Sequence, residues 1–324
     1  MADPRLKTSV PQAARHFAAA GTVLVARQAS AGVHTGYVPP WPGAVEPDFH
    51  ATAAAVWVWA RHQKLTRSEK FAAARNTAWT YLTEAAVRFI PNVIDADASD
   101  EAAFDCAMLL RAVTAELPLG RMDPTRQALA ARAARVLSAH LGALDDLAGR
   151  DFRDPGFLAL AVLEYARTVE DRGLLAAGQK FVERAFGMRN PGTFAREPEP
   201  PGGLFDFSST TATRILAVMA AEGSTPFVGA WLRERIAAGA PRSFTARRLD
   251  ENGWNACVAW ALGRAYVVST DPALLEGYTA ILDEIERRDA DRDGAIGRDA
   301  TVRVAEVMPT LYYALAVDAL VTHV

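Results

Sequence analysis

The chain has 324 residues, of which 50% are hydrophobic and 23% are charged. This composition is that of an ordinary soluble protein, and it excludes a disordered, collagen-like or highly charged chain. The net charge of -3 gives no electrostatic reason to expect binding to nucleic acid or to an anionic membrane. Cys106 and Cys257 are the two cysteines, which excludes a disulfide framework and a zinc site built from cysteines.

An apolar run near the start of the sequence, residues 17–26, follows Arg5, Lys7 and Arg15. It has the outline of a signal peptide, but it contains one leucine, and Asp3 lies in the region that should be basic. We therefore expect it to belong to the first amphipathic helix. No apolar run approaches the ~18 residues that span a bilayer, and we expect a soluble, cytoplasmic protein.

Helix signals follow one another along the chain, and strand signals are nearly absent. Thr66 and Glu69 form a capping box, which predicts the start of a helix. Asp123 comes directly before Pro124, as an N-cap residue comes before a proline in the first turn of a helix. The pattern predicts an all-α protein.

Two kinds of helical segment alternate. One kind is rich in alanine and apolar on nearly all sides, which predicts a helix buried on all sides. Its six members are 51–60, 102–113, 156–166, 211–221, 253–266 and 306–320. The other kind has one charged face, which predicts a helix at the surface. Its six members are 11–28, 67–89, 125–147, 172–187, 226–239 and 272–288.

Six hairpins with a buried inner ring and an amphipathic outer ring describe an (α/α)6 toroid, and we expect residues 1–324 to form one such domain. An open solenoid of helix pairs has the same local pattern, but it needs polar terminal helices. The last inner segment is as apolar as the others, which favours the closed ring.

Connections from an outer to an inner segment are long, for example 29–48, whereas those from inner to outer are short, for example 63–66. In a toroid the long connections all emerge on one face. Long loops in compact domains tend to carry function. We therefore expect the site at the mouth of the ring, where the inner helices begin.

Three aspartates from different hairpins, Asp48, Asp97 and Asp206, lie beside predicted starts of inner helices. Close carboxylates push their pKa values apart, and apolar neighbours such as Phe205 and Phe207 raise the pKa of a carboxyl. We interpret Asp206 as a catalytic acid, Asp97 as a base or nucleophile, and Asp48 as an assisting group. Alternatively, these residues only cap helices, because acidic groups stabilise a helix N-terminus.

The same loops carry aromatic and polar residues that suit substrate binding. The proline-rich segment 34–50 holds aromatic rings that either stack on a ligand or pack against the rim of the ring. The substrate-binding candidates are Tyr37, Trp41, His50, Arg196, Trp254 and Asn255.

The segment 289–300 resembles a calcium-binding loop. Asp289, Asp291 and Asp293, followed by Gly294, match the first ligand positions of such a loop, but Ala300 stands where the bidentate glutamate is expected. The sequence predicts either an exposed turn or a modified calcium site, whose ligands would be Asp289, Asp291, Asp293 and Asp299. No phosphate-binding glycine motif is present, and we expect no nucleotide cofactor.

The inner segments DFHATAAAVWVWA and FDFSSTTATRILAVMA resemble those of the α/α-toroid enzymes. Resemblance to the six-hairpin glycosidases and polysaccharide lyases implies a carbohydrate-active enzyme with a small-molecule or oligosaccharide ligand. From the net charge we expect no nucleic-acid or membrane partner. Resemblance to the terpenoid cyclases depends on residues 95–100, an imperfect D-x-D-D motif in which Ala98 replaces an aspartate. A non-catalytic ring that binds a ligand at its mouth is the third interpretation.

Overall fold

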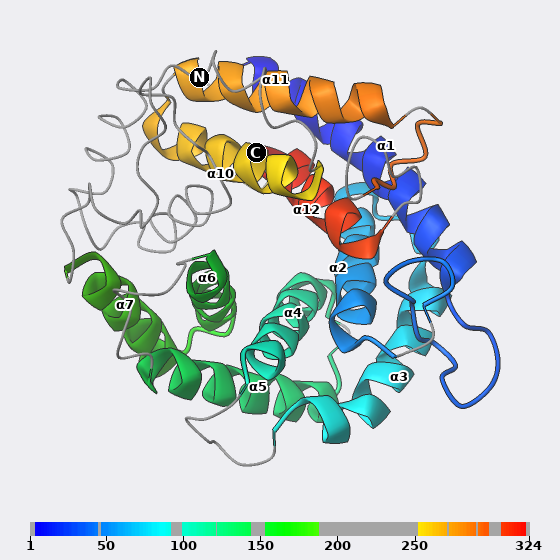
Figure 1. The fold of residues 1–324 in the computed structure, drawn as a ribbon, viewed down its shortest axis with the longest axis vertical. Helices are drawn as coiled ribbons and strands as arrows, with labels where there is room; N and C mark the ends of the chain where they lie inside the picture. Colours follow the sequence, from blue (N-terminus) through cyan, green and yellow to red (C-terminus); the bar gives the residue numbers. More distant parts are fainter. Residues whose placement is uncertain are drawn as a thin grey trace.

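The computed structural model describes five outer and five inner helices of a ring (Figure 1). The described residues are 4–44, 47–91, 99–120, 122–143, 153–187, 252–270, 272–289, 291–297 and 306–321. Within these ranges the regular elements are helices, and none is a β-strand. The expected inner segment 211–221 and outer segment 226–239 lie outside the described residues.

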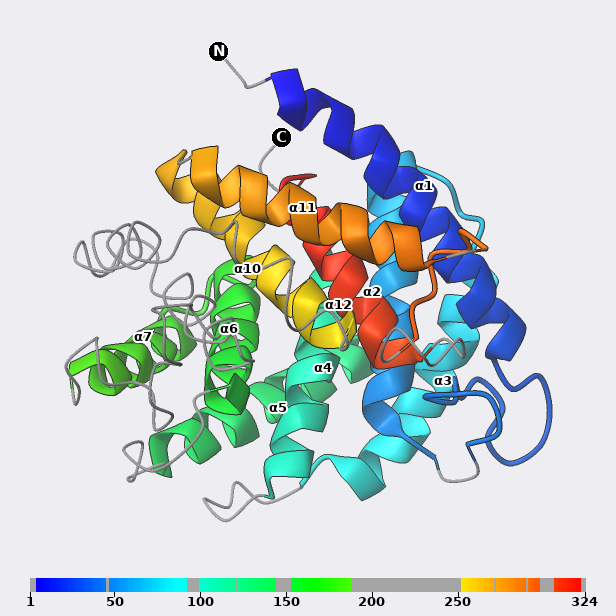
Figure 2. The ribbon, with the colours of Figure 1, turned by 45° about the horizontal axis from the view of Figure 1, so that its top comes forward.

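The two kinds of helix alternate along the chain as the sequence predicts. The outer helices are α1 (Pro4–Arg27), α3 (Ala72–Phe89), α5 (Pro124–Ala143), α7 (Arg172–Gly187) and α11 (Pro272–Arg288). The inner helices are α2 (Phe49–Thr66), α4 (Asp100–Glu116), α6 (Arg153–Thr168), α10 (Asn252–Ser269) and α12 (Val307–Asp318). Figure 2 shows the outer helices surrounding the inner ones.

The inner helices pack closely because their residues are small and apolar. In α2 nearly every residue from Phe49 to His62 is buried, on all sides of the helix. A Cβ atom on Gly263 of α10 would lie 2.8 Å from the ring of Tyr278 on α11 and 2.9 Å from Cβ of Ala319. Glycine at this position therefore lets α10 approach both of its neighbours.

The ring is closed between its first and last described hairpins. Helix α12 packs against α1 and α2 as well as against α10. Arg61 of α2 and Asp318 of α12 form a buried ion pair, with 2.5 Å between the guanidinium nitrogen and the carboxylate oxygen. These contacts confirm the (α/α)6 toroid and rule out the open solenoid.

The helix boundaries confirm one predicted cap and correct another. Asp123 accepts a hydrogen bond from the backbone N–H of Arg126 at 2.9 Å, and α5 begins at Pro124, as expected. The capping box at Thr66 was wrong, because Thr66 is the last residue of α2 and Arg67 ends that helix in the left-handed conformation. Helix α3 begins at Ala72 without a side-chain cap.

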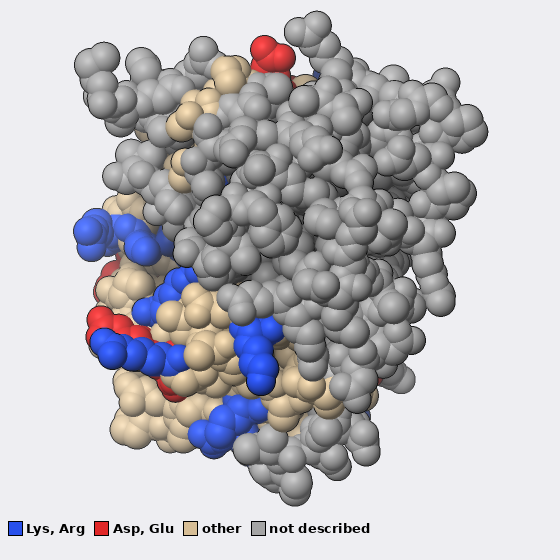
Figure 3. Space-filling model, turned by 90° about the vertical axis from the view of Figure 1, so that its left-hand side faces the viewer, with Lys and Arg blue, Asp and Glu red and all other residues tan. Residues whose placement is uncertain are grey.

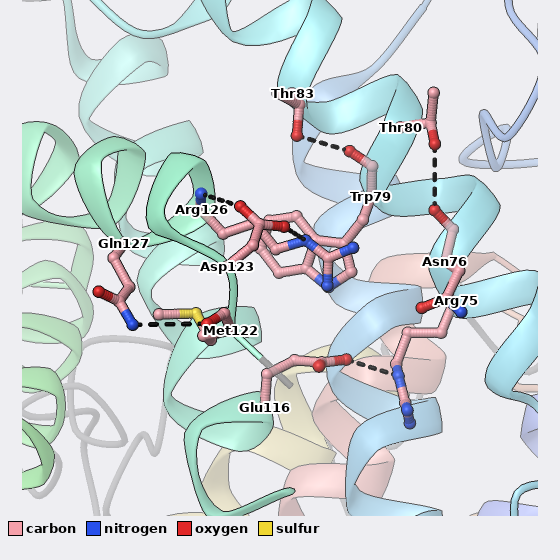
Figure 4. Close-up of polar contacts among 10 residues, drawn as sticks. All are labelled: Arg75, Asn76, Trp79, Thr80, Thr83, Glu116, Met122, Asp123, Arg126 and Gln127. Atoms are coloured by element: carbon pink, nitrogen blue, oxygen red, sulfur yellow. Dashed lines mark hydrogen bonds and ion pairs between the residues drawn. The ribbon is translucent and has the colours of Figure 1, made fainter. Parts of the chain in front are cut away.

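The face with the short connections is held by a buried ion pair (Figure 4). Arg75 of α3 and Glu116 at the end of α4 are 2.5 Å apart, and their side chains are 1% and 0% exposed. Nearby, the guanidinium of Arg126 lies 4.8 Å from the ring centroid of Trp79, and it also pairs with Asp123 at 3.0 Å. These contacts join α3, α4 and α5 on the side opposite the mouth.

Figure 3 shows the side of the molecule on which α7 lies, and the described part of this face carries Lys and Arg side chains together with Asp and Glu side chains, among uncharged residues. No helix within the described ranges is long and apolar enough to cross a membrane.

Candidate functional site

The loop between α1 and α2 is fixed at the mouth of the ring. Gln28 donates from its side-chain amide to the carbonyls of Gly36 and of Ala74 on α3, at 3.1 and 2.8 Å. Farther along the loop, the backbone N–H of Val307, the first residue of α12, donates to the carbonyl of Pro40 at 2.8 Å. The loop therefore bridges the first and last hairpins on the mouth side.

Tyr37 and Trp41, both substrate-binding candidates on this loop, have different environments. Tyr37 is buried, and its ring centroid lies 5.5 Å from that of Tyr81 on α3. Trp41 is 51% exposed. Of the two rings, only that of Trp41 offers an open surface for stacking.

Asp48 caps helix α2 and also contacts His50. Its Oδ1 accepts a hydrogen bond from the backbone N–H of Ala51 at 2.9 Å, which is the capping role that the sequence left open. Its Oδ2 lies 3.0 Å from Nε2 of His50. Both carboxylate oxygens of Asp48 are therefore engaged.

His50 joins α2 to α4 through Asp105. Its Nδ1 lies 3.1 Å from Oδ1 of Asp105, whose side chain is 4% exposed. Sequence reasoning missed Asp105, because it lies one and a half turns inside an apolar helix and not in the preceding acidic loop. The available signal was the presence of an ionisable residue on a helix buried on all sides, since carboxylates are seldom buried without a partner.

Electrostatics within this triad of Asp48, His50 and Asp105 favour the imidazolium. Burial lowers the pKa of His50, but hydrogen bonds and charge interactions with Asp105 and Asp48 outweigh it and raise this pKa to about 9. Burial raises the pKa of Asp105, with the negative charges of Asp48 and Glu101 acting in the same direction and His50 opposing them. Asp105 therefore has the environment of a carboxyl whose proton affinity is increased.

A row of aromatic rings continues from the triad across the inner helices. The ring of Phe104 lies 5.1 Å from that of His50 and stacks on Phe157 of α6 at 5.4 Å. Phe157 meets Trp260 of α10 and Tyr312 of α12 edge-on, at 6.3 and 6.2 Å. The rings of Phe104 and Tyr312 are partly exposed.

Arg111 lies beneath this aromatic row. Its guanidinium carbon is 4.5 Å from the ring centroid of Phe157 and 4.9 Å from that of Trp260. Its Nη1 pairs with Glu164 of α6 at 3.1 Å. Buried between two rings and paired with a carboxylate, this cation fixes the row and joins α4, α6 and α10.

The hydroxyl of Tyr81 lies near the triad without a hydrogen bond to the described residues. The ring is buried, and burial, followed by the nearby Tyr37 and the negative charges of Asp48 and Asp105, raises the pKa of the phenol. Buried polar groups in proteins are usually paired, often by an ordered water.

The other catalytic and substrate-binding candidates are less informative. Asp97, Asp206 and Arg196 lie outside the described residues. Trp254 lies in the first turn of α10, and Asn255 follows it and is buried. The structure therefore brings together Asp48 and His50 from the predicted set, and it adds Asp105.

Three of the four predicted metal ligands lie together. Ligand oxygens of Asp289, Asp291 and Asp293 all lie within 4.8 Å of one another, whereas Asp299 lies outside the described residues. Asp289 and Asp293 also accept backbone N–H groups of Gly294 and Ala295, at 2.9 and 2.8 Å. Burial and the contact with Asp291 raise the pKa of Asp289 to about 6. An all-oxygen set of this kind suits calcium, and the same hydrogen bonds also stabilise the turn by themselves.

Comparison with known proteins gives matches in structure but not in sequence. No protein family and no curated protein matches the sequence. The α-1,6-mannanase GH76A of Salegentibacter sp. HEL1_6 superposes with a TM-score of 0.59 and 11% identity, covering 98% of this chain and 100% of that one. An unsaturated glucuronyl hydrolase specific for heparin superposes with a TM-score of 0.63 and 11% identity, covering 99% and 98%. At this level of identity the likeness establishes architecture alone, and the chain has the (α/α)6 toroid fold of these two enzymes.

Proposed function

We propose that the chain is a carbohydrate-active enzyme, a glycoside hydrolase or a lyase-like enzyme, whose reactive carboxyl is Asp105. The observation that carries this proposal is the burial of Asp105 on an apolar inner helix, against His50 and close to a row of aromatic rings. The fold shared with two carbohydrate-processing enzymes supports it as an analogy.

Asp105 is suited to the role of an acid. A carboxyl with a raised pKa can retain a proton at neutral pH and donate it to the oxygen of a leaving group. Most glycosidases need a second carboxylate about 5–9.5 Å from the first. Glu101 lies one turn before Asp105 on α4, and Asp97 and Asp206 remain candidates from the sequence.

The aromatic residues would bind the sugar. The faces of sugar rings are apolar, so the partly exposed Phe104 and Tyr312 offer stacking surfaces beside the reactive carboxyl. Trp41, exposed on the fixed loop, would add a stacking surface at the rim. An oligosaccharide is therefore the proposed ligand.

The direct test compares wild type with Asp105→Asn on α-1,6-linked mannooligosaccharides and on unsaturated glucuronyl oligosaccharides. We expect turnover of one class by the wild type and a loss of about 10²–10⁴ in kcat for the variant. Chromatography of the products detects release of mannose units, and ultraviolet absorbance follows the unsaturated uronyl group.

Asp123→Asn is the matched control, because Asp123 is a helix-capping aspartate far from the mouth. Both variants should retain the helical circular dichroism of the wild type. Full turnover by a folded Asp105→Asn variant would refute the assignment. Turnover of isoprenoid diphosphates, with none of either glycan, would favour the terpenoid cyclase alternative.

A further inference from the structure

The geometry around His50 sets the smallest number of protons that the triad can hold. Both ring nitrogens face carboxylate oxygens, Nε2 at 3.0 Å from Asp48 and Nδ1 at 3.1 Å from Asp105. An ionised carboxylate only accepts hydrogen bonds, and a neutral imidazole has one donor and one acceptor nitrogen. The two contacts can coexist as hydrogen bonds only when the three groups hold at least two protons, which the imidazolium supplies in the simplest arrangement. A proton that Asp105 carries as an acid then lies on its Oδ2, because Oδ1 accepts from His50.

We propose that His50 is a positioning residue that stays protonated at neutral pH and clamps the carboxyl of Asp105 against the cap of α2. Its catalytic consequence rests on the proposed function. It does not act as the general base, because neither ring nitrogen has a lone pair free for a substrate proton.

The surroundings of His50 explain why the clamp is rigid. Asp48 is held by the backbone N–H of Ala51, so one end is fixed to helix α2. The ring of Phe104 meets the imidazole edge-on, with 82° between the ring planes, and restricts its rotation. The imidazole therefore has little freedom to leave Asp105.

The ionisable groups around the triad come from four elements. Asp48 lies at the start of α2, and Asp105 and Glu101 lie on α4. Tyr81 and Arg88 lie on α3, and Tyr37 lies on the first loop. The nearest negative charges are those of Asp48 and Asp105, and they favour the charged imidazole.

Asp48 and Asp105 differ in how many of their carboxylate oxygens accept hydrogen bonds. Both oxygens of Asp48 accept hydrogen bonds, one from Ala51 and one from His50. Asp105 uses Oδ1 for His50, and its Oδ2 has no hydrogen bond to a described residue. Asp48 is therefore the anchor of the clamp, and Asp105 presents one oxygen for chemistry.

The first test is an NMR titration of the histidine side chains, which needs no substrate. We expect the His50 resonance, identified by its absence in His50→Gln, to titrate at least one pH unit above a free histidine, whose pKa is about 6.5. Asp48→Asn should shift this titration to lower pH, while asparagine still caps the helix. His62→Gln, a change at the other end of α2, should leave it unchanged. A His50 that titrates as a free histidine, or ignores Asp48→Asn, would overturn the clamp.

The second test separates positioning from a merely structural role. The amide nitrogen of asparagine lies two bonds from Cβ, as Nδ1 of histidine does, and that of glutamine lies three bonds away, as Nε2 does. His50→Asn therefore retains a donor toward Asp105, and His50→Gln retains one toward Asp48. We expect His50→Gln to lower kcat by about 10- to 100-fold with little change in KM, and His50→Asn to recover part of that loss. Equal kcat values for both variants would contradict the proposal.

The two proposals can fail separately. A high His50 titration with an active Asp105→Asn variant would leave the clamp and remove the catalytic role of Asp105. A His50 that titrates as a free histidine, together with an inactive Asp105→Asn variant, would remove the clamp and leave the catalytic role of Asp105.

Discussion

Replacing Glu116 by glutamine tests the buried ion pair on the face opposite the mouth. The substitution keeps the shape of the side chain but removes its charge, so the buried guanidinium of Arg75 loses the carboxylate with which it pairs. Arginine cannot escape by losing its proton. Breaking one half of a buried pair costs about 3–5 kcal/mol, which corresponds to a decrease in Tm of about 6–10 °C at about 2 °C per kcal/mol for a chain of this size.

The opposite change, Arg75→Met, should lower the free energy of unfolding by less than Glu116→Gln does. It leaves Glu116 buried, but a carboxyl can take up a proton and become neutral. Its cost should therefore shrink as the pH falls, whereas that of Glu116→Gln should not. The double variant should be more stable than Glu116→Gln, because it no longer buries a guanidinium that has lost its carboxylate.

The assay is thermal and urea unfolding followed by circular dichroism, on the four proteins of this double-mutant cycle. Arg287→Ala is the control for an exposed ion pair, with an expected cost of at most about 1 kcal/mol. A Glu116→Gln variant that is no less stable than Arg287→Ala would refute the reasoning.

Four further outcomes follow from single side chains. The side-chain contacts of His50 raise its pKa from the ordinary 6.5 to about 9 in the folded protein. The protonated imidazole therefore stabilises the fold by at most about 3 kcal/mol, a contribution that is complete below pH 6.5 and lost as the pH rises through 9. The difference in Tm between the wild type and His50→Gln should accordingly become small by about pH 10. Gly36→Ala should lower Tm because its Cβ would lie 2.1 Å from a backbone oxygen, whereas Gly43→Ala, also at positive φ but in open space, should cost less. Tyr81→Phe should change stability by less than about 1 kcal/mol, since its hydroxyl has no described partner to lose; a larger loss would reveal a paired hydroxyl. If Asp289, Asp291 and Asp293 bind calcium, the ion should add about 2.7 kcal/mol to the free energy of unfolding at 100 times its Kd and so raise Tm, and Asp291→Ala should abolish the rise; an unchanged melting curve would favour the simple turn.

The fold was predictable because the apolar pattern of each helical segment, taken by itself, indicates whether that helix is inner or outer. An alanine-rich segment such as 51–60, apolar on all sides, can only be an inner helix, and its alternation with amphipathic segments then fixes the architecture. Local signals were less reliable. The pattern at Thr66 and Glu69 satisfies a capping box, yet α2 extends through Thr66, because packing in the ring outweighs about 1 kcal/mol of capping energy.

The candidate site was only partly predictable. Asp48 and His50 could be found, because they lie where a long loop meets an inner helix. Asp105 could not be paired with His50, since the two are 55 positions apart and no local pattern links them. The cluster of acidic residues in the preceding loop also gave a stronger sequence signal than the single carboxylate inside the helix.

Ring closure through Arg61 and Asp318 has a consequence for synthesis of the protein. The two partners are 257 positions apart, and a ribosome that adds about 5–20 residues per second needs about 13–50 s to travel between them. During that interval the face of α2 that α12 later covers is exposed on the nascent chain. The apolar edge of the first hairpin is therefore the surface that a chaperone would have to protect, and the one from which aggregation would begin when translation stalls.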